Sequence, residues 1–187
     1  IDDVKNINFL DIGAGTGDMV FLAKSAGLNA NGLEFSSFAR AKALDNFEIN
    51  LSSKDISEIE KDHYHMIHTN HVFEHFNQPL KELKHIHDGL KSGGLLYIEI
   101  PMQFHIIQRF KHLLNKDRRS YNLHSIHHPF FYNEKVLCDI LQKRGFVVIE
   151  SNTLTRTDNM SKLKSIFWKI ASMFSVGNII EVYSKKL

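Results

Sequence analysis

A glycine-rich segment gives the strongest indication of the fold class: Phe9-Leu10-Asp11-Ile12-Gly13-Ala14-Gly15-Thr16-Gly17. A short apolar run ends at three glycines, and apolar residues at helical spacing follow directly. Glycine is needed where a backbone must turn tightly and approach a ligand with no Cβ in the way. The amides that open the following helix favour a negatively charged group. The stretch therefore predicts a strand, a ligand-binding turn and a helix, although a plain strand-to-helix turn would show the same pattern.

The glycine spacing and the next acidic residue limit the classes of ligand that this turn could bind. The spacing is G-x-G-x-G, and Asp18 stands where a dinucleotide-binding loop has its third glycine. An acid there is unfavourable for a pyrophosphate, which argues against NAD. Glu34 lies at the C-terminal end of the next apolar run, and a carboxylate there can accept hydrogen bonds from both hydroxyls of a ribose. A surface glutamate after a buried strand is the alternative interpretation.

Strand-like and helix-like segments alternate along the rest of the chain. Strands are predicted at 7–12, 30–35, 47–51, 64–72, 95–100, 146–150 and 179–184. Helices are predicted at 19–26, from a Ser36 cap to 44, between an Asn77 cap and Gly93-Gly94, at 103–114, from an Asn133 cap to Gly145, and at 160–174. Such alternation is typical of a parallel sheet with helices on both faces. We expect one domain over residues 1–187, with a preceding segment, because the first strand begins almost at once.

Composition excludes several classes of protein. The chain has 187 residues with 12 histidines, one cysteine and a net charge of +2. A single cysteine excludes an internal disulfide and cysteine-cluster metal sites, and it favours a cytoplasmic setting. The sequence contains no run of 18 apolar residues, so no membrane span is predicted. The first residues do not resemble a signal peptide. The charge is too small to indicate a nucleic-acid partner.

Several motifs in a fixed order resemble one family. They are residues 11–17, Gly32-Leu33-Glu34-Phe35-Ser36, His71-Val72-Phe73-Glu74-His75-Phe76, and residues 90–96 followed by Ile100-Pro101. Over residues 8–150 the chain resembles class I S-adenosylmethionine (SAM)-dependent methyltransferases, in the small-molecule group with ubiquinone-type and sugar methyltransferases. The resemblance implies a Rossmann-like, mostly parallel sheet of seven strands, the last one antiparallel. It also implies methyl transfer from SAM to an oxygen or carbon nucleophile of a small molecule, such as a sugar or quinone.

The resemblance assigns cofactor-binding roles to matching positions only. It places three glycines against the methionine part of SAM, one acid at its amino end, one on the ribose and one near the adenine, and two residues beneath the sulfonium. The three glycines are Gly13, Gly15 and Gly17. The acid at the amino end is Asp11, the one on the ribose is Glu34 and the one near the adenine is Asp55. The two residues beneath the sulfonium are Asn70 and His71. For Asp55 a helix N-cap is an alternative role.

Histidines supply the candidate catalytic residues. His75 is the preferred general base, since an unperturbed imidazole titrates near neutral pH, and Glu74 and His128 are the other candidates. Glu74 and His75 could instead form a structural pair that supports the loop. His124 and His128 are expected on the substrate side, within residues 102–132, which we predict, with 151–178, to be substrate-side or lid insertions.

Two other functions stay open. The chain could be a catalytically silent SAM-binding module or partner subunit. His71-x-x-Glu74-His75 also matches the H-x-x-E-H zinc-hydrolase motif, but that motif needs a helix, and the next predicted helix leaves little room for one. We therefore expect no metal. The chain is expected to be a monomer or a homodimer.

Overall fold

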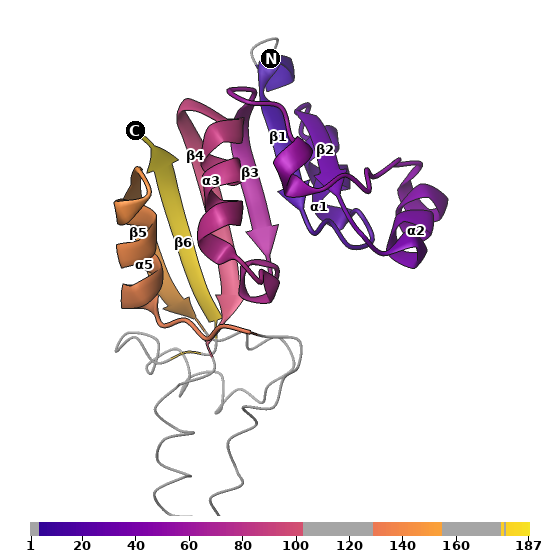
Figure 1. Cartoon of the computed structure of the whole chain (residues 1–187). Coiled ribbons are helices and arrows are strands. Elements are labelled where there is room, and N and C mark those ends of the chain that lie inside the picture. The colour runs from indigo at the N-terminus through magenta and orange to yellow at the C-terminus, as the bar shows by residue number, and fades with distance from the viewer. Residues whose placement is uncertain (1–3, 103–128, 155–176, 178) are drawn as a thin grey trace, which may run out of the picture.

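The computed structural model of the chain describes residues 4–102, 129–154, 177 and 179–187. Six strands form one sheet in the order β2-β1-β3-β4-β6-β5 (Figure 1). Strand β6 runs antiparallel to both of its neighbours, whereas the remaining pairs are parallel, which confirms the predicted mostly parallel sheet. The strands are β1 (Asn8–Ile12), β2 (Asn29–Leu33), β3 (Tyr64–Asn70), β4 (Leu90–Pro101), β5 (Phe146–Leu154) and β6 (Ile179–Lys186).

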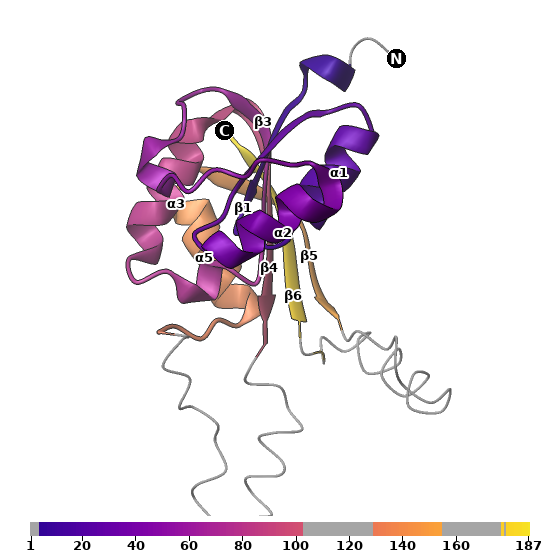
Figure 2. The ribbon, with the colours of Figure 1, turned by 90° about the vertical axis from the view of Figure 1, so that its right-hand side faces the viewer.

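Helices lie on both faces of this sheet. Figure 2 shows α3 and α5 on one face and α1 on the other, while α2 lies beyond β2 at the sheet edge (Figure 1). The α3 and α5 face buries the larger apolar cluster, which includes Ile67, Leu83 and Leu137. The helices are α1 (Asp18–Ser25), α2 (Ser37–Phe47), α3 (Pro79–Gly89) and α5 (Glu134–Lys143), with short 3-10 helices η1 (Val4–Asn6), η2 (Ile56–Glu58) and η3 (Phe73–His75).

The prediction of a seventh strand at 47–51 is wrong for the described chain. Helix α2 continues to Phe47, and Glu48 ends it in a left-handed conformation. Ile49 and Leu51 are buried as strand residues would be, but only Ser52 forms a bridge, to the last residue of β2. The alternating apolar residues correctly predicted which side chains are buried. They did not predict strand pairing, because a segment can be buried without forming a hydrogen-bonded ladder.

The ends of α3 also differ from the prediction. The helix begins at Pro79 after Gln78, so Asn77 is not its cap, and it ends at Gly89. Gly93 and Gly94 lie inside β4, where the pairing with β3 shifts register between Tyr64 and Met66. The two glycines therefore belong to a strand irregularity rather than to a helix end, a position where glycine is common.

Two predicted caps are confirmed. The Ser36 hydroxyl accepts a hydrogen bond from the Ala39 N–H at 3.2 Å, and the Asn133 side chain accepts one from the Val136 N–H at 2.8 Å. The helices predicted at 103–114 and 160–174 lie outside the described residues. Within the described parts of the chain, no helix is long and apolar enough to cross a membrane.

Candidate active site

Three strands deliver predicted site residues to one edge of the sheet. The glycine loop (residues 13–17) follows β1, Glu34 follows β2, and Asn70 ends β3. Strand β1 pairs in parallel with β2 on one side and with β3 on the other, so the carboxyl ends of the three strands meet. Ligands of open α/β sheets bind at this edge.

The glycine loop is shaped by all three of its glycines. Gly13, Gly15 and Gly17 have left-handed backbones, with φ of 72°, 52° and 85°. A Cβ on Gly13 would lie 2.2 Å from Cγ2 of Val72, and one on Gly17 would lie 3.0 Å from Cβ of Ala43. A Cβ on Gly15 would meet no atom within 4 Å. Packing thus disfavours a side chain at Gly13 and, less strongly, at Gly17, whereas Gly15 leaves room for a ligand against bare backbone.

Glu34 is held over this loop by two backbone amides. The Gly15 N–H donates to Oε2 of Glu34 at 2.9 Å, and the Ser36 N–H donates to Oε1 at 2.7 Å. Each carboxylate oxygen keeps a further lone pair that can accept a hydroxyl proton. Glu34 also lines a cavity of about 70 Å³ together with Gly13 and Phe35. This arrangement fits the ribose role predicted for Glu34.

Asp11 is paired with a histidine that the sequence patterns did not single out. Asp11 and His68 are register neighbours on β1 and β3, and Asp11 Oδ1 lies 2.7 Å from His68 Nδ1 in a buried setting. Burial raises the pKa of the Asp11 carboxyl, while the His68 hydrogen bond and charge oppose that rise and the charge of Glu34 adds to it. The His68 ring stacks on Tyr97, with 5.0 Å between ring centroids. The predicted contact of Asp11 with the amino end of SAM stays a prediction.

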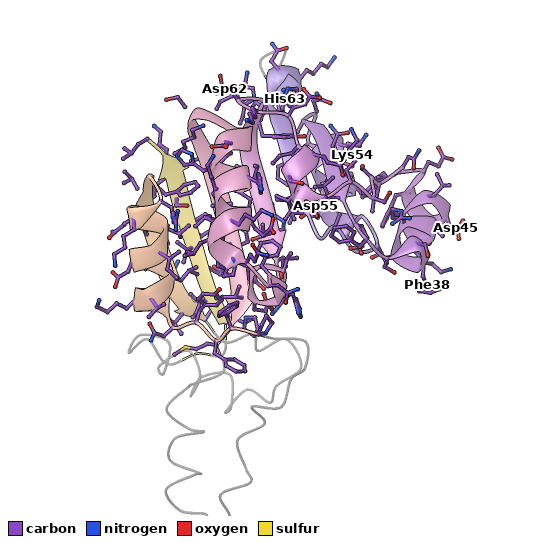
Figure 3. All side chains as sticks on the ribbon, in the orientation of Figure 1. Phe38, Asp45, Lys54, Asp55, Asp62 and His63 are labelled. Carbon is purple, nitrogen blue, oxygen red and sulfur yellow. The ribbon has the colours of Figure 1, made fainter. Side chains whose placement is uncertain are left out.

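Asp55 is the N-cap of η2 and lies on the connection between α2 and β3 (Figure 3). Its side chain accepts hydrogen bonds from the N–H and hydroxyl of Ser57, and the Glu58 side chain accepts one from the Asp55 N–H. These bonds to Ser57 lower the pKa of Asp55. The N-cap role is therefore present, whereas a contact with the adenine stays a prediction.

His71 lies between two buried carboxylates. It follows β3 with φ of 53°, a conformation uncommon outside glycine, and its N–H donates to the Glu99 carbonyl at 2.9 Å. Its Nδ1 is 3.5 Å from Glu74 Oε1, and its Nε2 is 3.5 Å from Glu99 Oε1. Beside it, the buried Asn70 Oδ1 has no hydrogen-bond partner among the described residues. A buried oxygen of this kind fits a site that binds a ligand.

Glu74 links His71 to the preferred base. Its side chain is 3% exposed, and its Oε1 is 4.0 Å from Nε2 of His75, whose side chain is 42% exposed. Burial raises the pKa of Tyr132 to about 12, and the charge of Glu74 adds to the rise. The sequence patterns missed Glu99 and Tyr132, although a lone acid in the apolar run 95–100 is a signal that could have found Glu99.

The zinc-hydrolase motif lacks the helix that it needs. Glu74 and His75 lie on η3, which has three residues, and His71 precedes it. Within the described residues, no group of three or more histidine, cysteine, aspartate or glutamate side chains could hold a metal ion. His124 and His128 lie outside the described residues, so their predicted roles stay predictions.

Solved structures share the fold of this chain. A SAM-dependent methyltransferase from Archaeoglobus fulgidus aligns with a TM-score of 0.69 and 15% identity, over 99% of this chain and 89% of that one. One from Mesorhizobium loti gives 0.71 and 15%, over 100% and 94%. Phosphoethanolamine N-methyltransferase 2 from Haemonchus contortus, in complex with S-adenosyl-L-methionine, gives 0.68 and 21%, over 97% and 49%. Comparison with curated proteins gives no match.

The fold and the edge site define an α/β domain whose predicted site residues lie at the carboxyl ends of parallel strands. The methyltransferase domain family matches residues 2–151, and the chain belongs to that family. The predicted enzyme class is thereby confirmed, as is the resemblance to class I methyltransferases.

Proposed function

We propose that the chain transfers a methyl group from SAM to an oxygen or carbon nucleophile of a small molecule. The observation that carries this proposal is the Glu34 carboxylate, held by the Gly15 and Ser36 amides beside a cavity at the edge of the sheet. When bound, SAM would supply an electrophilic methyl group, whose carbon the nucleophile attacks in line as the carbon–sulfur bond breaks and S-adenosylhomocysteine leaves. The chain's own residues would orient both reactants, and such alignment can contribute roughly 7–11 kcal/mol.

Each cofactor residue would act on a different part of SAM. Glu34 would accept hydrogen bonds from the ribose hydroxyls, and Asp55 would lie near the adenine. Asp11 would orient the amino end, while the glycine loop (residues 13–17) lies against the methionine part. Asn70 and His71 would form the wall beneath the sulfonium, a role supported by the buried Asn70 Oδ1.

His75 would take the proton that the nucleophile loses. Glu74 supports this role, because its buried carboxylate lies 4.0 Å from Nε2 of His75 and can orient the imidazole ring. Glu74 itself and His128 are the other candidates. General base catalysis of this kind contributes typically about 10²- to 10⁴-fold. Residues 102–132 and 151–178 would supply the acceptor side, including His124 and His128. Strand β4 ends at the same edge of the sheet, directly before the first of these two segments (Figure 1).

Methyl transfer to a panel of hydroxyl, carbon-acid and amine acceptors tests the proposal. We expect S-adenosylhomocysteine and a methylated product with an oxygen or carbon acceptor. We also expect His75→Ala to lower kcat about 10²- to 10⁴-fold while leaving SAM affinity unchanged. Methylation of amines alone would contradict the proposed acceptor. Binding of SAM without turnover across the panel would favour a silent binding module.

A further inference from the structure

Arg40 on α2 contacts the segment that carries Glu34. Its Nη1 donates to the carbonyl oxygens of Glu34 and Phe35, each at 2.8 Å. A terminal guanidinium nitrogen has two hydrogens, so a single nitrogen can hold both carbonyls at once. The resemblance assigns no role to this position.

The geometry of one peptide links Arg40 to the Glu34 carboxylate. The Phe35 carbonyl and the Ser36 N–H belong to the same peptide, which is planar. Arg40 holds the carbonyl side of that plane, and the N–H side donates to Oε1 of Glu34 at 2.7 Å. Fixing the carbonyl therefore also fixes the direction of the N–H that holds the carboxylate.

Two further bonds keep Arg40 in place relative to that peptide. The Arg40 N–H donates to the Ser36 carbonyl at 3.0 Å, as part of the first turn of α2. The Ser36 hydroxyl caps the same turn through the Ala39 N–H. The end of β2, the start of α2 and the Glu34 side chain thus share one hydrogen-bonded unit, and every residue in it lies in the described chain.

We propose that Arg40 is a positioning residue for SAM binding, which acts through Glu34 and does not itself touch the cofactor. The proposal rests on the proposed ribose role of Glu34. Without the guanidinium, the Phe35–Ser36 peptide can rotate, and the Glu34 carboxylate loses a donor that keeps it in place. The affinity for SAM should then fall because the ribose acceptor is no longer preorganised.

The test is SAM binding by calorimetry for Arg40→Met and for a matched control, Lys42→Met. Both substitutions place a good helix former on α2 and remove one positive charge. Lys42 is half exposed, and its only ion pair in the described chain is with Asp45 at 3.9 Å. We expect the Kd for SAM to rise roughly 3- to 10-fold in Arg40→Met, as for the loss of one hydrogen bond. Lys42→Met should leave it unchanged.

A double-mutant cycle separates positioning from a structural role. In a Glu34→Ala background, Arg40→Met should have no further effect on the Kd, because its partner is gone. An equal loss in both backgrounds, or a lower Tm with an unchanged Kd, would overturn the proposal. If Arg40→Met does not fold, Arg40→Gln, which is too short to span both carbonyls, is judged by the same criteria. Should Glu34→Ala alone leave the Kd unchanged, the ribose role itself would fail, which is a distinct outcome.

Discussion

At the scale of single residues, the Asp11–His68 pair joins two parts of the molecule. Asp11 stands directly before the glycine loop (residues 13–17), while His68 lines a cavity of about 610 Å³ over the sheet face that carries α1. Met66, Tyr97 and other residues of that face line the same cavity. A change in the position of this pair would therefore reach both the proposed cofactor site and this cavity.

The pair predicts how stability depends on pH. Burial raises the pKa of Asp11 above its ordinary 3.8, so the fold favours the protonated carboxyl. The stability from this group is complete below the ordinary pKa and is lost as pH rises through the raised one. Asn is neutral at every pH, so Asp11→Asn should flatten that decline and keep the contact with His68. SAM binding should weaken in the same variant.

Urea unfolding from about pH 4 to 8 measures this effect. The exposed Asp45, on the outer helix α2 (Figure 3), offers Asp45→Asn as a control that should leave the pH dependence as in the wild type. If Asp11→Asn also retains the wild-type pH dependence, burial is not what controls this carboxyl.

At the scale of elements, the cap of η2 allows the two roles proposed for Asp55 to be tested separately. Asp55→Ala removes the cap and should lower the free energy of unfolding by about 0.5–2 kcal/mol. Asp55→Ser retains a hydroxyl that can accept from the Ser57 N–H, so it should preserve most of the stability. If the carboxylate lies near the adenine, the serine variant should still bind SAM more weakly than the wild type. Equal SAM affinity in a folded Asp55→Ser variant would leave the cap as the only function of Asp55.

Elements with both a capping residue and a periodic apolar pattern could be predicted from the sequence. Asn133 and the apolar residues after it predicted α5, and the Ser36 cap predicted the start of α2. The pattern at 47–51 misled, because Ile49 and Leu51 are buried without forming a strand. Glycines were equally ambiguous, since Gly93-Gly94 can end a helix or interrupt a strand.

At the scale of the whole molecule, the parallel sheet brings residues that are far apart in the sequence together in one site. The glycine loop and Glu34 were predictable because each follows its own strand, and parallel strands bring their carboxyl ends together. His68 and Arg40 were not predictable in this way. Their partners depend on strand register and on how one helix turn meets a strand end, neither of which a local pattern encodes.

Titration with SAM measures whether the sheet edge that carries Glu34 binds the cofactor. The series is wild type, Glu34→Ala and Asp45→Ala. Asp45→Ala is the control, because it deletes an exposed acidic side chain in the same region of the chain. We predict saturable binding by the wild type and by Asp45→Ala with the same Kd. Glu34→Ala should bind at least about tenfold more weakly, because hydrogen bonds to a charged group contribute roughly 1.5–3 kcal/mol. Equal affinity of Glu34→Ala and wild type would contradict the assignment of this edge as the SAM site.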